Sequence, residues 1–584
     1  MAVSKRTLRT PPVSPWRARL HPLLRKTFGL RHLREGQEAV IASVMQGHPT
    51  LAIMPTGGGK SLCYQLPALL LPAMTLVVSP LIALMKDQCD KLRELGVSAW
   101  QLNSALPAAE IEAAERAIAE GDAKIVFTTP ERLADPAFLD SLAAGKVSLL
   151  VIDEAHCISQ WGHDFRPAFL EIGPAVDRLG RPALLALTAT ATEAVIDDIG
   201  RQLGVRFTVV STGMYRPNLH YAVTQVTNEA DKLARAVELV AAAEGAGLVY
   251  TATVKAAEEV HAALLAAGVA SGLYHGKVGA AKRHEQQDAF MDGRVRVMVA
   301  TNAFGLGIDK ADTRFVLHYQ MPGGLDAYYQ ESGRAGRDGE AARCMLLFLH
   351  ADKAVQQFFM AGKYPSREDL LALYLALLQE RSDGARWTLE LLQEAFDRPK
   401  ARLQVALRLL RHQRVVRQDR EGRLHLTRAG LDDAALEKLL AGYRDKRESD
   451  RDMLERMVFY GQTGHCRWKV LLEPFGEAEG FSACGSCDNC VRIELVAELA
   501  PAVAEAPTST EASAAAASRP AFAPGDAVQV ARYGRGVVDA VDGEGVTVCF
   551  AEGVSRAFLA DFVRPVAARG RRRAAGRPVA ELGT

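Results

Sequence analysis

The segment from Leu51 to Ser61 reads Leu-Ala-Ile-Met-Pro-Thr-Gly-Gly-Gly-Lys-Ser. Its apolar start is typical of a buried parallel strand, and a helix-like stretch follows its end. The glycines allow backbone N–H groups to turn inward around phosphate groups at a helix N-terminus. A glycine turn that merely precedes a lysine is the simpler alternative, but strand, loop and helix follow in the order that a phosphate loop requires. The predicted phosphate-binding residues are Thr56, Gly57, Gly58, Gly59, Lys60 and Ser61, with Lys60 at the β- and γ-phosphates and Ser61 on Mg²⁺.

A second strand-like segment, from Leu149 to His156, reads Leu-Leu-Val-Ile-Asp-Glu-Ala-His and ends in two carboxylates. Asp153 is placed to hold Mg²⁺, and Glu154 is placed to polarise the attacking water. A lone Asp-Glu pair after a strand is more often solvated surface. Together with the phosphate loop, the pair indicates hydrolysis of a nucleoside triphosphate, and we assign a catalytic role to His156 as well.

Phosphoryl transfer also needs positive charge at the transition state. The segment from Gln330 to Arg337 reads Gln-Glu-Ser-Gly-Arg-Ala-Gly-Arg and supplies Arg334 and Arg337. A basic turn is the alternative interpretation. The segment follows the apolar run at 297–301, which favours an arginine finger that acts between two lobes. We assign that role to Arg337 and include Gln330 and Arg334 in the catalytic set.

Length and patterning predict several domains. The chain has 584 residues, 48% of them hydrophobic and 24% charged, and its 70 basic residues nearly balance 69 acidic ones. Short apolar runs alternate with amphipathic stretches from about residue 25 to 350, which predicts an α/β fold with parallel sheets covered on both faces. One core seldom holds so many residues, so we expect two lobes. The predicted bounds are 1–24 for an N-terminal extension, 25–207 for the first lobe and 208–355 for the second.

Residues 364–430 are helical in pattern and basic, with nine arginines and lysines between Arg398 and Arg423. A short helix at 387–396, a second at 399–411 and a hairpin near Gly422 suggest a winged-helix-like module whose arginines face duplex phosphates. A solvated helical connector is the alternative. Beyond it we expect a zinc-binding module at 435–494, a disordered linker at 495–521, a small β-barrel at 522–566 and a basic tail at 567–584.

Four of the nine cysteines form one cluster in the sequence, Cys466, Cys484, Cys487 and Cys490. Four thiolates at this spacing can surround Zn²⁺ tetrahedrally and leave no open position, which predicts a structural site. An iron–sulfur cluster is the chemical rival. The other five cysteines, at positions 63, 89, 157, 344 and 549, stand singly among apolar residues, as buried reduced thiols do.

The longest apolar stretch, Leu66 to Val78, has 13 residues and contains two prolines. It falls short of the ~18 to 20 residues that span a bilayer. The basic N-terminus carries prolines and lacks the apolar run of a secretory signal. We expect no membrane contact and a cytoplasmic protein.

These blocks, in this order, resemble a superfamily 2 helicase, and more narrowly the RecQ family. The deciding segment, Asp153 to Pro167, reads Asp-Glu-Ala-His-Cys-Ile-Ser-Gln-Trp-Gly-His-Asp-Phe-Arg-Pro and is similar to the aromatic-rich loop of that family. The resemblance implies two RecA-like lobes, zinc at the cysteines, and an ATP-dependent 3′–5′ helicase acting on single-stranded and partially duplex DNA in repair and recombination. It implies that Gln37, with Arg34, selects ATP. It also implies that Trp161, Phe165 and Arg166 bind single-stranded DNA, where aromatic side chains stack on bases without reading sequence.

The sequence departs from the common RecQ order because the basic module precedes the cysteines instead of following them. The stretch from Pro524 to Val537 resembles the Tudor-like barrel of UvrD-type helicases, which implies docking of repair or transcription proteins or of nucleic acid. Three other functions stay open. They are a DNA-stimulated translocase or strand annealer with little unwinding, a nucleotide-gated DNA-binding scaffold, and an enzyme that acts on RNA.

Overall fold

The computed structural model divides into two units, residues 1–500 and 501–584, each considered by itself. It describes residues 15–499 except 160, 163–164, 306–309, 364–365, 380–385, 397, 399, 413–414, 420–421 and 428–432. In the second unit it describes 522–566 except 531–533, 543–544, 551–554 and 560–562. The predicted basic tail and residues 500–521 of the predicted linker lie outside these ranges.

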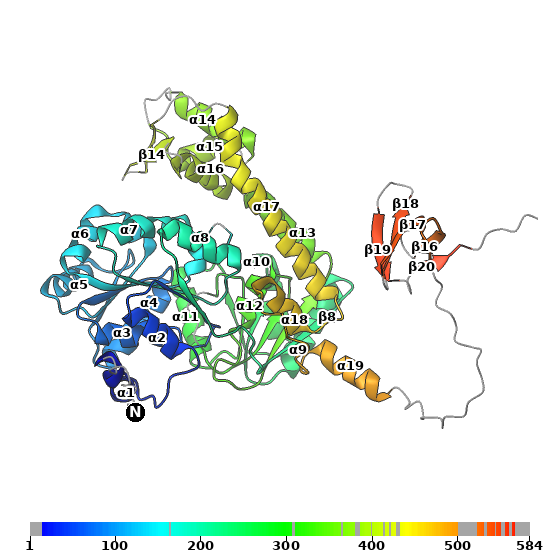
Figure 1. Ribbon diagram of the computed structural model, residues 1–584, viewed down its shortest axis with the longest axis horizontal. Helices are drawn as coiled ribbons and strands as arrows, with labels where there is room; N and C mark the ends of the chain where they lie inside the picture. Colours follow the sequence, from blue (N-terminus) through cyan, green and yellow to red (C-terminus); the bar gives the residue numbers. More distant parts are fainter. Residues whose placement is uncertain are drawn as a thin grey trace, which may run out of the picture. The chain divides into compact units, whose positions relative to one another are not determined.

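Lobe 1 is a seven-stranded parallel sheet with helices on both faces (Figure 1). Alternate residues of β5 enter opposite cores, with Leu150 and Ile152 in one and Leu149 and Val151 in the other. This two-sided burial explains the uninterrupted apolar runs. The strand order is β3-β4-β2-β5-β6-β1-β7. The strands are β1 (Thr50–Ile53), β2 (Met74–Val78), β3 (Ala99–Leu102), β4 (Ile125–Thr128), β5 (Val147–Ile152), β6 (Ala183–Thr188) and β7 (Thr208–Ser211). The helices are α2 (Gln37–Met45), α3 (Leu62–Leu70), α4 (Ile82–Glu94), α5 (Ala108–Glu120), α6 (Pro136–Ala144), α7 (Ile172–Arg178) and α8 (Glu193–Leu203).

Two predicted boundaries of lobe 1 are wrong. The predicted start of the second lobe at residue 208 cuts off β7, which pairs with β1 in the first sheet. The predicted extension at 1–24 includes most of helix α1 (Pro15–Phe28), whose Leu20 and Leu24 pack in one cluster with Leu62 and Leu66 of α3. Both segments are short and carry no motif, so only their contacts assign them to the lobe.

Lobe 2 is a six-stranded parallel sheet with the order β10-β11-β9-β12-β13-β8. Together the two lobes confirm the predicted α/β architecture. The strands are β8 (Leu219–Gln225), β9 (Ala246–Tyr250), β10 (Ser271–Tyr274), β11 (Val297–Ala300), β12 (Thr313–His318) and β13 (Ala342–Phe348). The helices are α9 (Glu229–Ala242), α10 (Val254–Ala266), α11 (Ala280–Met291) and α12 (Leu325–Ser332).

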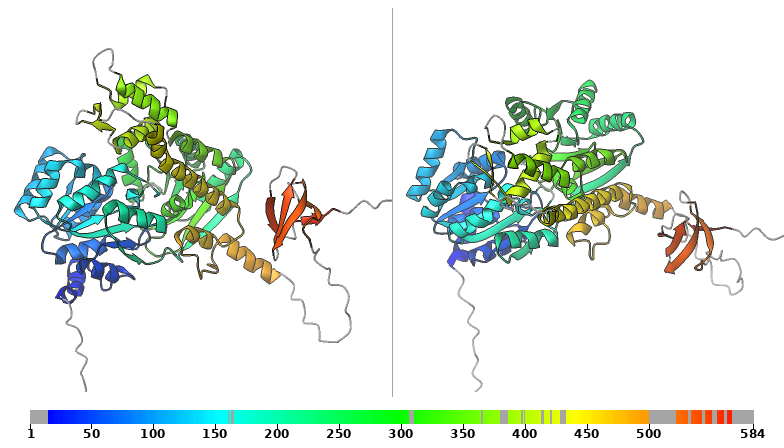
Figure 2. Two further views of the ribbon diagram at one scale, coloured as in Figure 1. Left: turned by 45° about the horizontal axis from the view of Figure 1, so that its top comes forward. Right: turned by 90° about the horizontal axis from the view of Figure 1, so that it is seen from above.

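Two helices, α13 (Asp352–Lys363) and α17 (Asp433–Gln462), contact each other and form an arm on lobe 2 (Figures 1 and 2). The chain between them forms an arm unit of three helices and a hairpin around its own core. Buried Asp369 pairs with Arg398 and Arg402 inside this unit, at 3.0 and 3.2 Å. The unit is therefore inserted between two helices that pack together. Its elements are α14 (Arg367–Leu378), α15 (Leu389–Ala395), α16 (Lys400–His412), β14 (Val416–Gln418) and β15 (Leu424–Leu426).

After the arm, α18 (Arg467–Leu472) and α19 (Asp488–Leu499) frame the cysteine cluster. Helix α19 continues to Leu499, so the predicted linker does not begin at 495. The second unit is an antiparallel five-stranded sheet with the order β19-β18-β17-β16-β20 and a valine-rich core. Its strands are β16 (Ala527–Val530), β17 (Gly534–Asp542), β18 (Gly545–Phe550), β19 (Ser555–Leu559) and β20 (Val563–Pro565). Among the described helices, none is both long and apolar enough to cross a bilayer.

Candidate functional site

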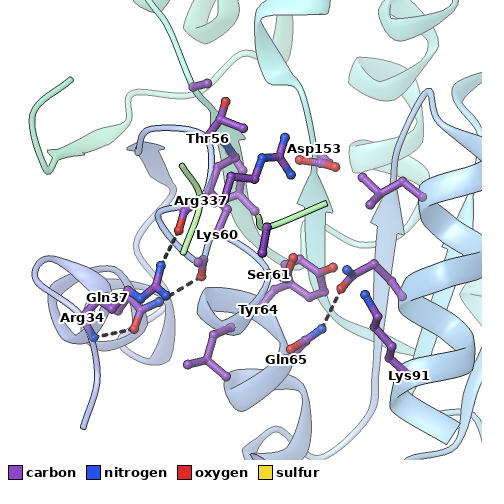
Figure 3. Close-up of a pocket in the computed structure, with 18 of the residues that line it drawn as sticks. Arg34, Gln37, Thr56, Lys60, Ser61, Tyr64, Gln65, Lys91, Asp153 and Arg337 are labelled. Atoms are coloured by element: carbon purple, nitrogen blue, oxygen red, sulfur yellow. Dashed lines mark hydrogen bonds between the residues drawn. The ribbon is translucent and has the colours of Figure 1, made fainter. Parts of the chain in front are cut away.

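A pocket of about 570 Å³ lies where the two lobes meet (Figure 3). Parallel strands end at a common edge, so the loop after β1 and the carboxylates after β5 come together there. Lobe 2 adds Gln330 from α12 and two arginines, Arg334 and Arg337, from the segment after it. The sequence-predicted residues in the lining are Arg34, Gln37, Thr56, Gly57, Gly59, Lys60, Ser61, Asp153, Glu154, Gln330, Arg334 and Arg337. Of the predicted nucleotide and catalytic residues, only Gly58 and His156 are outside this lining.

The phosphate loop depends on glycine at two positions of left-handed backbone, Gly57 at φ +83° and Gly59 at φ +81°. Side chains rarely adopt this conformation. A Cβ atom at Gly57 would also lie 3.3 Å from Cγ of Arg337. The Nζ atom of Lys60 donates to the carbonyl of Met54, at 3.2 Å, and burial lowers the pKa of Lys60. The loop is thus shaped for close backbone approach and holds its cation within the pocket.

The two carboxylates follow β5 through a strained turn. Glu154 has φ +51° and ψ +48°, a backbone conformation that costs a non-glycine residue about 1 to 3 kcal/mol. Burial, and next the charge of Glu154, raise the pKa of Asp153 to about 7, while Lys60 opposes the shift. Ser79 Oγ, at the end of β2, lies 3.4 Å from Asp153 Oδ2. The strained backbone lies where two adjacent carboxylates face Lys60. This arrangement is suited to binding Mg²⁺ and to activating a water molecule.

His156 is buried behind the carboxylates, and its Nδ1 lies 3.0 Å from Oγ1 of Thr188 and 3.4 Å from Oε2 of Glu154. Two residues after Thr188, the hydroxyl oxygen of Thr190 accepts a hydrogen bond from Nε2 of Gln330, at 3.4 Å. Gln330 belongs to lobe 2 and Thr190 to lobe 1. His156 therefore links Glu154 to the end of β6. Gln330 links the residues just after β6 to lobe 2.

Gln37 and Arg34 bind the phosphate loop itself. Gln37 is buried, and its Nε2 donates to the carbonyl of Gly59 at 3.0 Å, while the N–H of Arg34 donates to Oε1 of Gln37 at 2.7 Å. The guanidinium of Arg34 donates to the carbonyl of Gly57. Both predicted ATP-selecting residues thus sit beside the loop, within the pocket.

The three predicted DNA-binding residues are separate from the nucleotide pocket. Trp161 is half-buried and packs against the core of lobe 1, and it lines a second pocket of about 520 Å³ with His156 and residues of α17. Phe165 and Arg166 are also half-buried. Lys446 of α17 donates to the carbonyl of Gly162, at 3.3 Å, so the arm touches the aromatic loop directly.

The four clustered cysteines converge as predicted. Their sulfur atoms lie within 4.8 Å of one another, and four thiolates bound to one Zn²⁺ at ~2.3 Å would lie about 3.8 Å apart. Backbone N–H groups donate to three of the sulfurs at 3.3 to 3.5 Å, which favours thiolates. The spacing suits a single tetrahedral ion, so the residues fit zinc. Of the five single cysteines, four are buried and Cys549 is half-buried.

The cluster is joined to lobe 2 by buried polar contacts. Arg467 makes a two-point pair with Asp488, at 2.9 and 3.0 Å. Asp488 in turn accepts a hydrogen bond from the backbone N–H of Val223, at 2.9 Å. The fully buried indole of Trp468 donates to the carbonyl of Leu219, at 3.1 Å. The zinc module and lobe 2 therefore share one core.

Two parallel-sheet lobes that share one phosphate-loop pocket, with a four-cysteine centre on the second lobe, place the protein among the two-lobed helicase-type ATPases. The DEAD/DEAH box helicase family matches residues 34–199, and the helicase conserved C-terminal domain matches 231–339. The RecQ zinc-binding family matches 430–491.

Relatives agree with these matches. The ATP-dependent DNA helicase RecQ of Bacillus subtilis is 46% identical over 345 residues, which are 59% of this chain and 58% of that protein. RecQ of Pasteurella multocida is 40% identical over 57% of this chain and 52% of that protein. The matches thus span little more than half of these two relatives. The probable ATP-dependent DNA helicase RecS of Bacillus subtilis is 34% identical over 81% of this chain and 92% of its own length. The chain belongs to the RecQ family of superfamily 2 DNA helicases.

A solved structure supports the fold alone. The crystal structure of the DUF1998 helicase MrfA bound to DNA superposes with a TM-score of 0.50 and 18% identity, covering 72% of this chain and 64% of that chain.

Proposed function

We propose that the protein is an ATP-dependent 3′–5′ DNA helicase. The observation that carries the proposal is the convergence of Lys60, Asp153, Glu154 and Arg337, from two lobes, on one pocket. The polarity and the substrate are supported by membership of the RecQ family.

In this proposal Ser61 and Asp153 would hold the Mg²⁺ of Mg·ATP, and the ion would supply positive charge to the phosphates. Lys60 exchanges its bond with the Met54 carbonyl for the phosphates. Glu154 orients and deprotonates the attacking water, and Arg337 reaches across from lobe 2 to the transferred phosphoryl group. The lobes close on the nucleotide and reopen after hydrolysis.

DNA would bind through Trp161, Phe165 and Arg166. His156, which lies between Trp161 and Glu154, would couple DNA binding to the nucleotide pocket. Separating one base-pair step costs about 1.4 kcal/mol of stacking on average, which is small beside the free energy of a nucleotide cycle.

The arm unit would act as a winged helix that holds duplex phosphates with its arginines. The second unit would act as a Tudor-like barrel that docks repair or transcription proteins or nucleic acid. We place the protein in the cytoplasm, at the nucleoid.

The deciding experiment supplies Mg·ATP and two partial duplexes, one with a 3′ and one with a 5′ single-stranded overhang. We expect displacement of the 3′-tailed duplex alone, and no displacement by Lys60→Ala. ATP turnover with DNA but no displacement would favour the translocase or annealer. More efficient displacement of an RNA-tailed duplex than of the DNA-tailed one would make RNA the better substrate.

A second prediction concerns nucleotide choice. Replacing Gln37 by alanine is expected to raise the KM for ATP about tenfold, because losing hydrogen bonds to a buried group costs about 1 to 3 kcal/mol. The KM for GTP should stay near its parental value, which makes GTP the internal control. Steady-state hydrolysis at varied ATP and GTP measures both constants. An equal rise in both would mean that Gln37 only supports the loop through Gly59.

A further inference from the structure

Arg216 connects the two halves of the nucleotide pocket. It lies between β7 and β8, where the chain passes from lobe 1 to lobe 2, and its side chain is buried. Its guanidinium donates to three carbonyls of the arginine-finger segment, residues 333–337, and to the Thr56 carbonyl of the phosphate loop at 3.4 Å. The three distances are 2.7 Å to Gly333, 2.9 Å to Ala335 and 2.5 Å to Gly336.

The carbonyls that accept hydrogen bonds from Arg216 need a donor from outside α12. Gly333 is the C-cap of α12, and the last carbonyls of a helix lack intrahelical donors and carry partial negative charge. A guanidinium offers five N–H donors in a fixed planar fork, so one side chain can satisfy several carbonyls at once. Arg216 therefore caps the C-terminus of α12 and also fixes the path of the backbone beyond it.

That path leads directly to Arg337. Gly336 has φ +55° and its carbonyl accepts from both Arg216 and Nδ2 of Asn218, the latter at 2.8 Å. The Gly336 carbonyl belongs to the peptide group from which Arg337 starts. Fixing that group fixes the base of the Arg337 side chain, which packs over Gly57 of the phosphate loop.

The segment that carries Arg216 is itself anchored. The N–H of Met214 donates to Oε2 of Glu477, in the zinc module, at 2.6 Å. The carbonyl of Met214 accepts from the hydroxyl of Tyr329, in α12, at 2.8 Å. Arg216 thus acts from a fixed backbone and does not simply follow the loop that it contacts.

We infer that Arg216 is a positioning residue for ATP hydrolysis, holding Arg337 against the phosphate loop through the carbonyls of residues 333–336. The inference rests on the proposed function. An arginine finger contributes about 10³ to 10⁵ to the rate, and a misplacement of about 1 Å can cost about 10²-fold. Loss of Arg216 should therefore remove part of the contribution of Arg337.

The test is a double-mutant cycle with Arg216→Met and Arg337→Ala, measured as DNA-stimulated hydrolysis at varied ATP. Arg216→Met alone should lower kcat about 10²-fold and change the KM for ATP by less than about threefold. In the Arg337→Ala background it should lower kcat by less than about twofold, because the finger is already gone. Arg216→Lys, which keeps the charge and fewer donors, should fall between parent and Arg216→Met.

Arg296 provides the matched control. It donates to the carbonyls of Val240, Ala243 and Gly245 at the end of α9, at 2.9, 2.6 and 3.4 Å, away from the nucleotide pocket. Arg296→Met removes the same kind of contact and should leave kcat at the parental value. The melting temperatures of both variants separate loss of fold from loss of positioning.

Two results would overturn the inference while the parent hydrolyses ATP. One is a kcat of Arg216→Met or of Arg216→Lys that equals the parental value. The other is an equal loss of kcat with and without Arg337, which would mean that Arg216 acts on the fold or on another residue. A parent that hydrolyses no ATP would overturn the proposed function first, and this inference with it.

Discussion

Replacing Cys487 by alanine is expected to unfold the zinc module and to destabilise lobe 2 with it. Binding of a structural Zn²⁺ contributes an apparent ~10 to 16 kcal/mol in small zinc modules, and the net stability of a whole domain is only ~5 to 15 kcal/mol. Cys487 is fully buried in the core that also holds Trp468, Tyr221 and Tyr328. The loss should therefore spread from the cysteine cluster into lobe 2.

Zinc content, near-ultraviolet circular dichroism and calorimetric melting measure this effect. Cys344→Ala is the matched control, because Cys344 is an equally buried thiol of lobe 2 that belongs to no cysteine cluster. We expect it to retain one zinc per chain and to melt close to the parent. If Cys487→Ala lost zinc yet melted with the parent, the metal would not hold the fold.

The parts of the fold that could be predicted are those whose physics is local in sequence. Two-sided burial of parallel strands produces continuous apolar runs such as the one before Asp153. The phosphate loop requires glycine at fixed places, and thiolate ligands come in short spacings. Each of these signals lies within 25 residues, the span from Cys466 to Cys490, so the phosphate loop, the carboxylate pair and the cysteine cluster could be found without a structure.

The rest depends on contacts between distant segments. Arg216 meets residues 333–336 of the other lobe, and Lys446 meets Gly162, and neither lies in a motif that indicates its partner. Ser79 was within reach of prediction, because strands β2 and β5 are neighbours and end at the same edge. The arm unit is recognised as an insertion because α13 packs against α17. The sequence pattern alone does not reveal this contact.

Replacing Glu154 by glutamine is expected to lower kcat for ATP hydrolysis by about 10² to 10⁴, because a positioned general base contributes that much. The carboxylate suits the role, since its Oε2 is buried beside the nucleotide pocket, with Nδ1 of His156 3.4 Å away. Glutamine keeps the size and the backbone conformation, so ATP and single-stranded DNA should bind with parental affinity. Single-turnover hydrolysis and fluorescence titrations measure the two properties separately.

Glu120→Gln, at the exposed end of α5, controls for loss of one negative charge in lobe 1 and should turn over ATP like the parent. A Glu154→Gln variant that behaved like the parent would instead favour a nucleotide-gated DNA-binding scaffold, in which hydrolysis has no part in the function.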